Sequence, residues 1–433
     1  MKSAWGLMMW RLIYTLLMYI LQPFILLFML FRSLKAPKYR SRLKERYGFY
    51  GTMLAPKPRG IMVHAASVGE VIAATPFIQA IQAKYPNLAI TVTTMTPTGS
   101  ERVKSAFGNR VTHLFLPYDL PGAVRRFINF VQPKVCIVIE TELWANLIHG
   151  LHQKQIPFII ANARLSERSA RRYGKVKNCL KEMLSEIELI APQDDFSGAR
   201  YQQIGYQGKL SLTGNIKYDL PISNELTQKM TAFKTTLGNR PIWIAASTHA
   251  GEEEIILKSH RTLLATYPDL LLILVPRHPE HFNVVAELIE QGNFSYIRRS
   301  TGQSPHKETQ ILLGDTMGEL MLMYGVSDVA FVGGSLIKRG GHNPLEPLAF
   351  KCPVISGKHT FNFPEVFAKL KQVNGMIEID ANPTALSQAV QTCLDNKTLR
   401  EQLGNAGFSV LMENRGALQR LMDLLTPYLE KAL

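Results

Sequence analysis

The chain has 433 residues, too many for one compact core, so two or three domains are expected. Its composition, 46% hydrophobic and 19% charged, excludes a low-complexity or fibrous chain. The formal net charge of +15 indicates an anionic partner, such as nucleic acid, an anionic membrane surface or an acidic substrate. A nucleic-acid partner is not expected, because the sequence has neither a basic stripe with stacking aromatics nor a known binding motif.

The first predicted element is the apolar segment 12–31, LIYTLLMYILQPFILLFMLF. It has about the ~20 apolar residues that a spanning helix needs, and membrane helices tolerate a proline such as Pro23. A cleaved signal peptide would be shorter and end in small residues. A basic flank follows, which the positive-inside rule places in the cytoplasm and which attracts anionic headgroups. Its residues are Arg32, Lys35, Lys38, Arg40, Arg42, Lys44 and Arg46. We expect a membrane anchor and basic flank at 1–46, single-pass or monotopic, with the other domains on the cytoplasmic side.

Beyond the anchor, short β-rich runs alternate with longer helical stretches, which predicts a Rossmann-like, doubly wound α/β domain at 47–220. Several of the runs are almost continuously apolar, as is typical of parallel strands buried on both faces. The expected strands are 61–65, 89–93, 111–116, 135–139, 158–161, 187–190 and 210–212.

The stretch HAASVGE, 64–70, places Ser67 and Glu70 where the first of these strands turns into a helix. The S-x-x-E spacing fits a capping box that satisfies free amides at the helix start. A carboxylate at the carboxyl end of a strand can also act as a general base. The residues alone leave both interpretations open.

Two further stretches of the first half carry charged residues after strands. In VIETELW, Glu140 and Glu142 share a face if the strand continues and diverge if a helix has begun. We expect a helix start, so that one carboxylate is functional and the other forms a structural salt bridge. In TGNIKYD, Lys217 either meets an anionic substrate or is a solvated surface lysine.

The sequence turns polar at 221–240, which predicts a linker with a short helix. The alternation then restarts and predicts a second Rossmann-like domain at 241–433 that includes a C-terminal helix. Because ligands of open parallel sheets bind at the carboxyl ends of strands, two such domains facing each other would form a cleft. The expected strands are 243–246, 271–275, 310–313, 329–332, 353–356 and 376–379.

Two motifs of the second half are suited to an anionic ligand. Arg277 of VPRHPE directly follows a strand, and a guanidinium is a rigid bidentate donor for phosphate. Gly318 and Glu319 of GDTMGEL could set backbone amides and a carboxylate against a nucleotide. The alternatives are a solvated arginine and an ordinary capped helix start.

The richest stretch is FVGGSLIKRGGHNPLEP, with glycines at 333–334 and 340–341. Asn343 and Pro344 then open a helix that carries Glu346, with proline at the favoured first position. Glycine loops that lead into a helix start form anion sites, whereas the alternative is a plain capped loop. Neither G-x-G-x-x-G nor a GK[ST] phosphate loop occurs, so no nicotinamide cofactor is indicated.

The cysteines indicate neither a zinc site nor a disulfide framework, because they lie far apart in the sequence. A reducing compartment is therefore expected. The four are Cys136, Cys179, Cys352 and Cys393.

Together the motifs resemble the signature stretches of the 3-deoxy-D-manno-oct-2-ulosonic acid (Kdo) transferases that act on lipid A in Gram-negative bacteria. The resemblance runs from the anchor to the C-terminal helix. The stretches are HAASVGE, TVTTMTPTGSERV, LPYDLP, IETELWANL, IANARLSERS, TGNIKYD, STHAGEEE, LVPRHPE, GDTMGELM, FVGGSLIKRGGHNPLEP and HTFNF.

The resemblance implies an inverting, metal-independent GT-B glycosyltransferase at the cytoplasmic face of the inner membrane. It would transfer Kdo from CMP-Kdo to the lipid A precursor lipid IVA, so its partners would be these two substrates and inner-membrane lipids, with no cofactor. The SVGE glutamate, Glu70 here, would accept the proton, and Glu140 and Lys217 would stabilise the transition state. CMP would be held by the PR, MGE and NPLE motifs: Pro276, Arg277, Met317, Gly318, Glu319, Asn343, Pro344, Leu345 and Glu346.

Two other classes of protein remain to be weighed. A sugar-nucleotide epimerase has the same two-domain fold, but it needs no membrane segment. A non-catalytic membrane-bound binding protein would have no need of Glu70.

Overall fold

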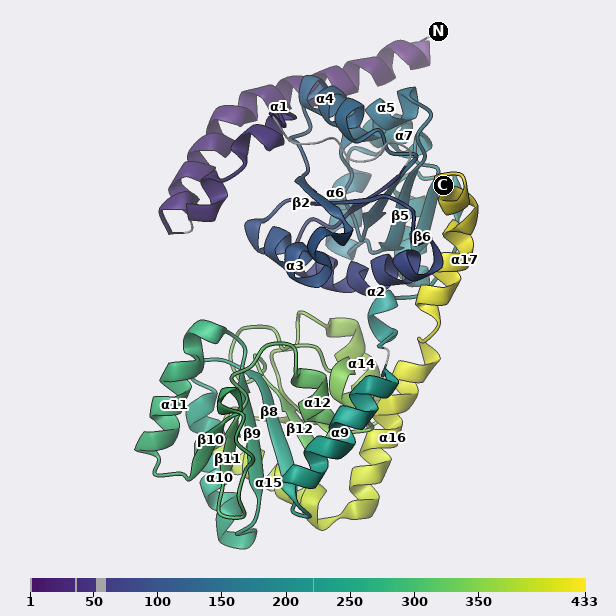
Figure 1. Cartoon of the computed structure of the whole chain (residues 1–433). Coiled ribbons are helices and arrows are strands. Elements are labelled where there is room, and N and C mark those ends of the chain that lie inside the picture. Colours follow the sequence, from purple (N-terminus) through teal and green to yellow (C-terminus); the bar gives the residue numbers. More distant parts are fainter. Residues whose placement is uncertain (1, 36, 52–59, 221) are drawn as a thin grey trace. The chain divides into compact units, whose positions relative to one another are not determined.

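The computed structural model describes residues 2–35, 37–51, 60–220 and 222–433. The chain divides into two compact units (Figure 1). The N-terminal unit comprises Met1–Asp219 and Arg415–Leu433, and the C-terminal unit comprises Leu220–Asn414. Each unit contains a seven-stranded sheet whose paired strands are all parallel, with apolar clusters on both faces. The expectation of two doubly wound α/β domains is confirmed.

The sheet of the N-terminal unit has the order β3-β2-β1-β4-β5-β6-β7. The order reverses between β1 and β4, and ligands of such sheets bind at the carboxyl ends of the strands at this switch point. The strands are β1 (Ile61–His64), β2 (Ile90–Thr94), β3 (Thr112–Phe115), β4 (Val135–Ile139), β5 (Phe158–Ala163), β6 (Leu189–Pro192) and β7 (Lys209–Leu210). The helices are α1 (Lys2–Lys35), α2 (Val68–Lys84), α3 (Pro97–Phe107), α4 (Pro121–Val131), α5 (Ala145–Gln153), α6 (Glu167–Gly174), α7 (Lys177–Ser185), α8 (Asp195–Gln203) and α17 (Ala417–Glu430), with the 3₁₀ turns η1 (Pro37–Arg40), η2 (Leu43–Tyr47), η3 (Gly108–Arg110) and η4 (Ile216–Tyr218).

Almost continuous apolar strands supply both cores of this sheet. In β1, Met62 contributes to the cluster on one face, and Ile61 and Val63 contribute to the cluster on the other. All four residues of β1 are buried. The period of two along a strand explains why a run without polar interruptions ends up covered on both sides.

The C-terminal helix α17 belongs to the N-terminal unit, which corrects the expectation that the second domain extends to residue 433. Its apolar side, including Leu421 and Leu425, packs in the same cluster as Phe77 of α2. The Asp219 carboxylate accepts hydrogen bonds from the Gly416 and Leu418 backbone N–H groups at 2.7 and 2.5 Å. Asp219 thus fixes the start of α17.

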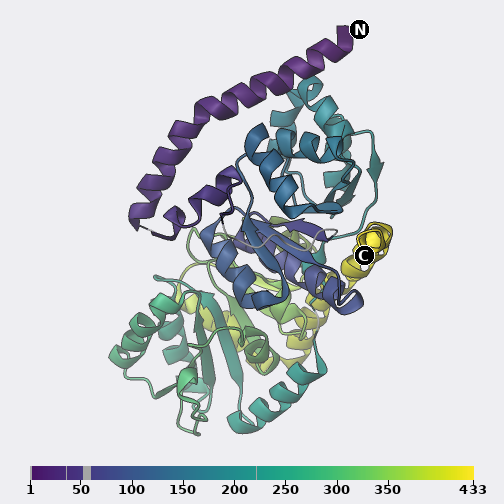
Figure 2. The ribbon, with the colours of Figure 1, turned by 45° about the horizontal axis from the view of Figure 1, so that its top comes forward.

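The N-terminal helix α1 is one continuous helix that curves in both views (Figures 1 and 2). Pro23 lies inside it and removes one backbone donor, which accounts for the bend. The segment Met9–Leu34 is long and apolar enough to cross a membrane. The helix also packs against α5 and α7 of its own unit.

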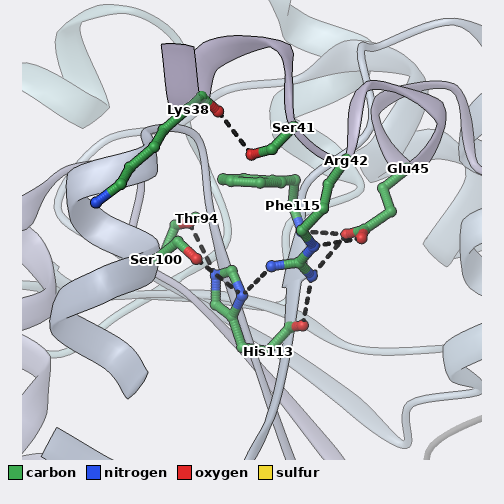
Figure 3. Close-up of polar contacts among 8 residues, drawn as sticks. All are labelled: Lys38, Ser41, Arg42, Glu45, Thr94, Ser100, His113 and Phe115. Carbon is green, nitrogen blue, oxygen red and sulfur yellow. Dashed lines mark hydrogen bonds and ion pairs between the residues drawn. The ribbon is translucent and has the colours of Figure 1, made fainter. Parts of the chain in front are cut away.

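Part of the basic flank is folded into the N-terminal unit (Figure 3). The Arg42 guanidinium pairs with the Glu45 carboxylate and donates to the His113 carbonyl at 2.8 Å. Arg46 is only 2% exposed, and its guanidinium lies 4.4 Å from the centroid of the Phe115 ring. These two arginines are therefore not available to lipid headgroups, and the folded unit begins ahead of residue 47, the expected boundary.

The sheet of the C-terminal unit has the order β10-β11-β9-β8-β12-β13-β14, with its switch point between β8 and β12. The strands are β8 (Ile242–Thr248), β9 (Leu271–Pro276), β10 (Tyr296–Arg298), β11 (Ile311–Leu313), β12 (Val329–Val332), β13 (Val354–Gly357) and β14 (Met376–Ile379). The helices are α9 (Asn224–Leu237), α10 (Glu253–Thr266), α11 (Phe282–Gln291), α12 (Leu320–Gly325), α13 (Leu345–Leu348), α14 (Pro364–Gln372), α15 (Pro383–Asp395) and α16 (Lys397–Glu413), with the 3₁₀ turns η5 (Pro279–His281) and η6 (Arg299–Thr301).

The expected linker 221–240 is largely the helix α9, which packs into this unit. Its residues Phe233 and Leu237 are buried in the core beside Ile242. Residue 221 itself lies outside the described residues.

Candidate active site

Glu70 lies in the first turn of α2, directly beyond the carboxyl end of β1. Its carboxylate accepts hydrogen bonds from the Ser67 hydroxyl at 2.9 Å and from the Ala66 backbone N–H at 2.7 Å. The Ser67 hydroxyl oxygen accepts in turn from the Glu70 backbone N–H at 3.3 Å. The capping interpretation is confirmed, and it fixes the rotamer of a carboxylate at the switch point.

Burial is the largest cause that raises the pKa of Glu70 above its ordinary value. The negative charge of Glu140 raises this pKa further, and the positive charge of Lys217 lowers it. All three predicted residues therefore lie within electrostatic reach of one another. A carboxylate with a raised pKa is a better proton acceptor near neutral pH than an ordinary glutamate.

Glu140 and Lys217 form an ion pair. Glu140 follows β4, the neighbour of β1, with a φ of 65°. A glutamate rarely adopts this left-handed region, and strain of this kind clusters at functional sites. The Lys217 ammonium donates to Glu140 Oε1 at 2.6 Å, and both side chains are partly buried. Lys217 is therefore not the solvated lysine of the alternative interpretation.

Glu142 does not behave as expected. No helix begins at Glu140; the chain stays irregular until α5 begins at Ala145. Burial, together with the charges of Glu70 and Glu140, raises the pKa of Glu142 to about 7. Both glutamates of the motif thus lie near Glu70, and the ion pair belongs to Glu140.

Asn162 is a residue that the sequence interpretation missed. It lies at the end of β5, is fully buried and has a φ of 51°. Its side-chain oxygen accepts from the Ile216 backbone N–H at 3.1 Å, which holds η4 and so positions Lys217. An asparagine within the apolar run FIIANA was the available signal, because a buried amide needs partners.

In the C-terminal unit, imidazoles and two arginines, Arg277 and Arg339, gather beyond β8, β9 and β12. The imidazoles of His249 and His342 stack at 5.0 Å between centroids, with their Nε2 atoms 2.8 Å apart. Burial lowers the pKa of His249 to about 4 and that of His342 to about 3, and the positive charge of Arg277 contributes to both shifts. His278 and Arg339 add to the shift of His249. The two imidazoles are therefore neutral at neutral pH, and the positive charges of Arg277 and Arg339 at this edge favour a phosphate or carboxylate ligand.

The sequence suggested that the backbone amides of the glycine loop after β12 form an anion site. In the structure, the amides of Gly334, Ser335 and Leu336 are already occupied by a side chain of the protein. The Glu252 carboxylate, fully buried, accepts from the backbone N–H groups of Gly334, Ser335 and Leu336 at 2.7, 3.1 and 3.0 Å. It also accepts from the His249 N–H at 3.1 Å. The protein's own carboxylate therefore fills this nest of amides, and Glu252 positions the loop. The stretch HAGEEE after a predicted strand was the signal for it.

The NPLE motif lies close to Arg277. The Asn343 side-chain oxygen accepts from the Leu345 N–H at 3.1 Å, and its amide donates to Glu346 at 3.3 Å. The helix α13 begins at Leu345, so Pro344 precedes the first helical residue instead of occupying it. Burial raises the pKa of Glu346 to about 7, while Asn343 and Arg277 lower it.

The MGE motif lies at a cavity of about 580 Å³ within the C-terminal unit, lined also by Lys229 and Phe233 of α9. Gly318 has a φ of +86°, and Met317 is 68% exposed. The Glu319 carboxylate is engaged by the Arg299 guanidinium at 2.8 and 3.1 Å, which holds its pKa low. Glu319 is therefore ionised. Its carboxylate contacts Arg299 and Thr316, and these contacts do not involve the PR or NPLE motif.

Within the described ranges, no group of three or more His, Cys, Asp or Glu side chains could hold a metal ion. The four cysteines are free thiols.

Two family models match consecutive parts of the chain, and both describe glycosyltransferases. A family model described as 3-deoxy-D-manno-octulosonic-acid transferase (kdotransferase) matches residues 41–220. A model described as glycosyl transferases group 1 matches residues 239–410.

Two curated relatives span this chain almost completely. A 3-deoxy-D-manno-octulosonic acid transferase from Haemophilus influenzae is 64% identical over 98% of this chain and 100% of its own length. One from Bordetella pertussis is 33% identical over 97% of this chain and 100% of its own.

Solved structures with a similar fold come from two kinds of enzyme. UDP-GlcNAc 2-epimerase from Neisseria meningitidis matches with a TM-score of 0.55 and 13% identity, over 84% of this chain and 100% of that one. A UDP-glucosyltransferase from Polygonum tinctorium matches with a TM-score of 0.54 and 10% identity, over 87% and 100%. At such identities the likeness shows only the shared architecture, that of GT-B glycosyltransferases, and the full-length relatives decide against the epimerase interpretation. The chain belongs to the 3-deoxy-D-manno-octulosonic acid transferase family.

Proposed function

We propose that the protein transfers Kdo from CMP-Kdo to the lipid A precursor lipid IVA and releases CMP, with inversion at the anomeric carbon. The observation that carries the proposal is the 64% identity to the Haemophilus influenzae transferase over 98% of the chain. The positive edge of the C-terminal unit supports it, because the donor carries a phosphate and a carboxylate.

Glu70 is the general base of the proposed reaction. The hydroxyl oxygen of the acceptor sugar attacks the anomeric carbon of Kdo, the bond from that carbon to the CMP phosphate oxygen breaks, and Glu70 takes the hydroxyl proton. CMP leaves with the electron pair of the broken bond. The raised pKa of Glu70 supports this role, because a sugar hydroxyl is a poor nucleophile without a base.

Glu140 and Lys217 stabilise the transition state in this proposal. As the leaving group departs, positive charge develops on the sugar ring and negative charge on the phosphate. A carboxylate and an ammonium held 2.6 Å apart can oppose both charges without reorganising. The strained backbone of Glu140 supports the same role, since strain persists where the surrounding structure fixes it.

The donor-binding residues are proposed in the C-terminal unit. Arg277, beside the histidine cluster, binds the phosphate of CMP. In this proposal, Glu319 and Glu346 accept hydrogen bonds from the hydroxyl and amino groups of the nucleoside. The complete proposed set is Pro276, Arg277, Met317, Gly318, Glu319, Asn343, Pro344, Leu345 and Glu346.

The proposed location is the cytoplasmic face of the inner membrane, with α1 as the anchor. One apolar helix near the N-terminus, Met9–Leu34, supports an anchor of this kind. The exposed basic residues Arg32 and Lys44 are placed to contact anionic headgroups.

Mass spectrometry of the lipid product tests the proposal. Purified protein is incubated with lipid IVA and CMP-Kdo in the presence of EDTA. A mass increase of one or more Kdo units is the expected result. Product that appears only after magnesium is restored would overturn metal independence, and no product under either condition from folded protein would overturn the function.

A further inference from the structure

The anchor helix α1 is fastened to the N-terminal unit by a buried polar network. The Tyr14 hydroxyl donates to Asp119 Oδ2 at 2.9 Å, and the Thr15 hydroxyl donates to Asn146 Oδ1 at 3.1 Å. Asp119 is 2% exposed and accepts from the backbone N–H groups of Asn146 and Leu147 at 2.9 and 2.8 Å. The same aspartate therefore caps α5 and holds α1. The anchor is part of the folded unit at this level, not a free tether.

A groove of about 290 Å³ lies between α1 and α7 at the turns that this network holds. Its walls are mainly apolar: Trp10, Ile13 and Leu17 come from α1, and Leu180 and Met183 come from α7. The volume is too small for a whole glycolipid and is suited to part of one acyl chain.

The outer side of the groove continues into the exposed apolar surface of α1. Single exposed apolar residues are ordinary on a protein surface, but a continuous apolar face of this length indicates a membrane contact. The exposed apolar residues of the helix are Met9, Trp10, Leu12, Ile13, Leu16, Leu17, Tyr19, Ile20, Leu21, Phe24, Leu27, Phe28, Leu30, Phe31 and Leu34. The apolar residues Trp10, Ile13 and Leu17 belong both to this exposed surface and to the groove lining, so the two are continuous along α1.

One wall of the groove lies at the start of α5, the helix that follows the loop of Glu140 and Glu142. Ala145 lines the groove and is the first residue of α5. Glu142 lies three residues before it in the irregular loop after β4, and the charges of Glu142 and Glu70 act on each other. The groove is therefore linked through Ala145 to the loop that carries Glu140 and Glu142.

The surface beside the groove is strongly basic and suits a phosphorylated headgroup. Six exposed lysines and arginines lie on α6, on α7 and between them: Arg168, Arg171, Arg172, Lys175, Lys177 and Lys181. Arg11 lines the groove itself. Two carboxylates also line it, and one of them, Glu186, is paired with His149 at 2.6 Å. The other, Glu182, is the remaining acidic group of the lining.

We propose that the groove between α1 and α7 binds one acyl chain of the glycolipid acceptor, which makes the anchor helix a wall of the acceptor site. This inference rests on the proposed function and adds a subsite to it. The groove favours the acceptor over a bulk phospholipid because its wall at Ala145 begins three residues after Glu142 and the basic surface matches a sugar that carries phosphates.

Photolabelling in lipid nanodiscs tests which lipid occupies the groove. The probe is a tetra-acylated glucosamine disaccharide bisphosphate with a diazirine at the end of an acyl chain, and the comparison probe is phosphatidylglycerol with the same diazirine chain. We expect the glycolipid probe to label residues 10–17 and 176–186, and unlabelled lipid IVA to displace it. Equal labelling by phosphatidylglycerol that lipid IVA does not displace would overturn the proposal in favour of bulk lipid.

A matched pair of variants tests the same subsite by kinetics. Cys179→Trp fills the groove, whereas Asn178→Trp places the same bulk on the neighbouring exposed position of α7. We expect Cys179→Trp to raise the KM for the tetra-acylated acceptor about tenfold, the effect of losing about two buried methylene groups. The KM for an acyl-free bisphosphorylated disaccharide should not change, and neither should any constant of Asn178→Trp.

The two proposals fail in different ways. An unchanged KM for the acylated acceptor in Cys179→Trp, together with no label at the groove, would overturn the subsite while transfer continues. No transfer by the wild type to either acceptor would overturn the proposed function, and labelling of the groove would then still support a glycolipid site.

Discussion

The two units have the same sheet architecture and carry different ionisable groups at the same place in it. At the switch point of the N-terminal unit, three glutamates gather, and burial raises the pKa of Glu70 and Glu142. At the switch point of the C-terminal unit, imidazoles gather beside Arg277, and burial lowers the pKa of His249 and His342. One site is suited to accepting a proton and the other to holding an anion. The contrast teaches that the fold fixes where a site lies, whereas the residues after each strand decide its chemistry.

The two sites are also supported in different ways. In the N-terminal unit, Glu140 and Asn162 hold left-handed backbone conformations at the ends of β4 and β5. In the C-terminal unit, the buried Glu252 carboxylate gathers four backbone N–H groups and shapes the loop after β12. The variants below separate the contributions of the two sites.

The largest expected effect is on turnover, from the variant Glu70→Gln. The amide keeps the shape of the side chain and cannot take a proton, so we expect kcat to fall about 10²–10⁴-fold. Affinity for CMP should be unchanged, since the residues proposed to bind the donor lie in the C-terminal unit. Turnover assays and calorimetric titration of CMP measure the two quantities, with the exposed Glu167→Gln as the control. Turnover near that of the wild type would remove Glu70 from its role.

The next effect is on donor affinity, from Arg277→Ala. Loss of a charged hydrogen-bond donor should weaken donor binding about tenfold to a hundredfold, or ~1.5–3 kcal/mol. The variant Arg277→Lys keeps the charge without the bidentate geometry, so its donor affinity should lie between those of the wild type and Arg277→Ala. Kd for CMP and KM for CMP-Kdo report the change. An unaltered KM in Arg277→Ala would count against the assignment.

A smaller effect is expected from Glu252→Ala, which leaves four backbone N–H groups without their partner. We expect a loss of about 1–3 kcal/mol in the free energy of unfolding, because orphaned buried donors are costly. Donor KM should rise as the loop after β12 loosens. Thermal unfolding and donor kinetics check both, with the exposed Glu254→Ala as the control. A Tm equal to that of the control would contradict the role of Glu252.

The last effect is on the pH dependence of stability, and it involves Glu142. Its pKa is about 7 in the folded chain and 4.5 ordinarily, so the folded state binds the proton more tightly. Stability therefore falls as pH rises from about 4.5 to about 7. Glu142→Gln should remove this loss. At pH 8 its free energy of unfolding should exceed that of the wild type by about 1–3 kcal/mol, and near pH 4 the two values should be equal. Denaturant unfolding at both pH values measures the difference; a variant less stable than the wild type at pH 8 would contradict it.

Much of the fold could be predicted because most strands are continuous apolar runs. The strand β10, Tyr296–Arg298, was missed because it is a half-buried edge strand with polar residues. The placement of α17 was missed for another reason. Its partners, including Asp219, are about two hundred residues away in the sequence, and an amphipathic pattern shows which face is buried without showing on what.

The candidate site was predicted in part. Motifs at strand ends identified Glu70, Glu140 and Lys217, because the geometry of parallel sheets brings such ends together. The sequence could not show that the amides of the glycine loop are occupied, since their partner Glu252 lies 82 to 84 residues earlier. Nor could it show that Arg42 and Arg46 are engaged by the N-terminal unit, because a basic cluster looks alike whether it is solvated or folded.

The most direct test of the account is the pH dependence of kcat, measured for the wild type and for the residual activity of Glu70→Gln. Because the base must be ionised and its pKa is raised, kcat of the wild type should fall on the acid side with a midpoint above pH 4.5. This limb should persist in Glu142→Gln and be absent from Glu70→Gln. The same limb in Glu70→Gln, or a wild-type rate that does not change with pH down to 4.5, would contradict the claim that Glu70 takes the proton.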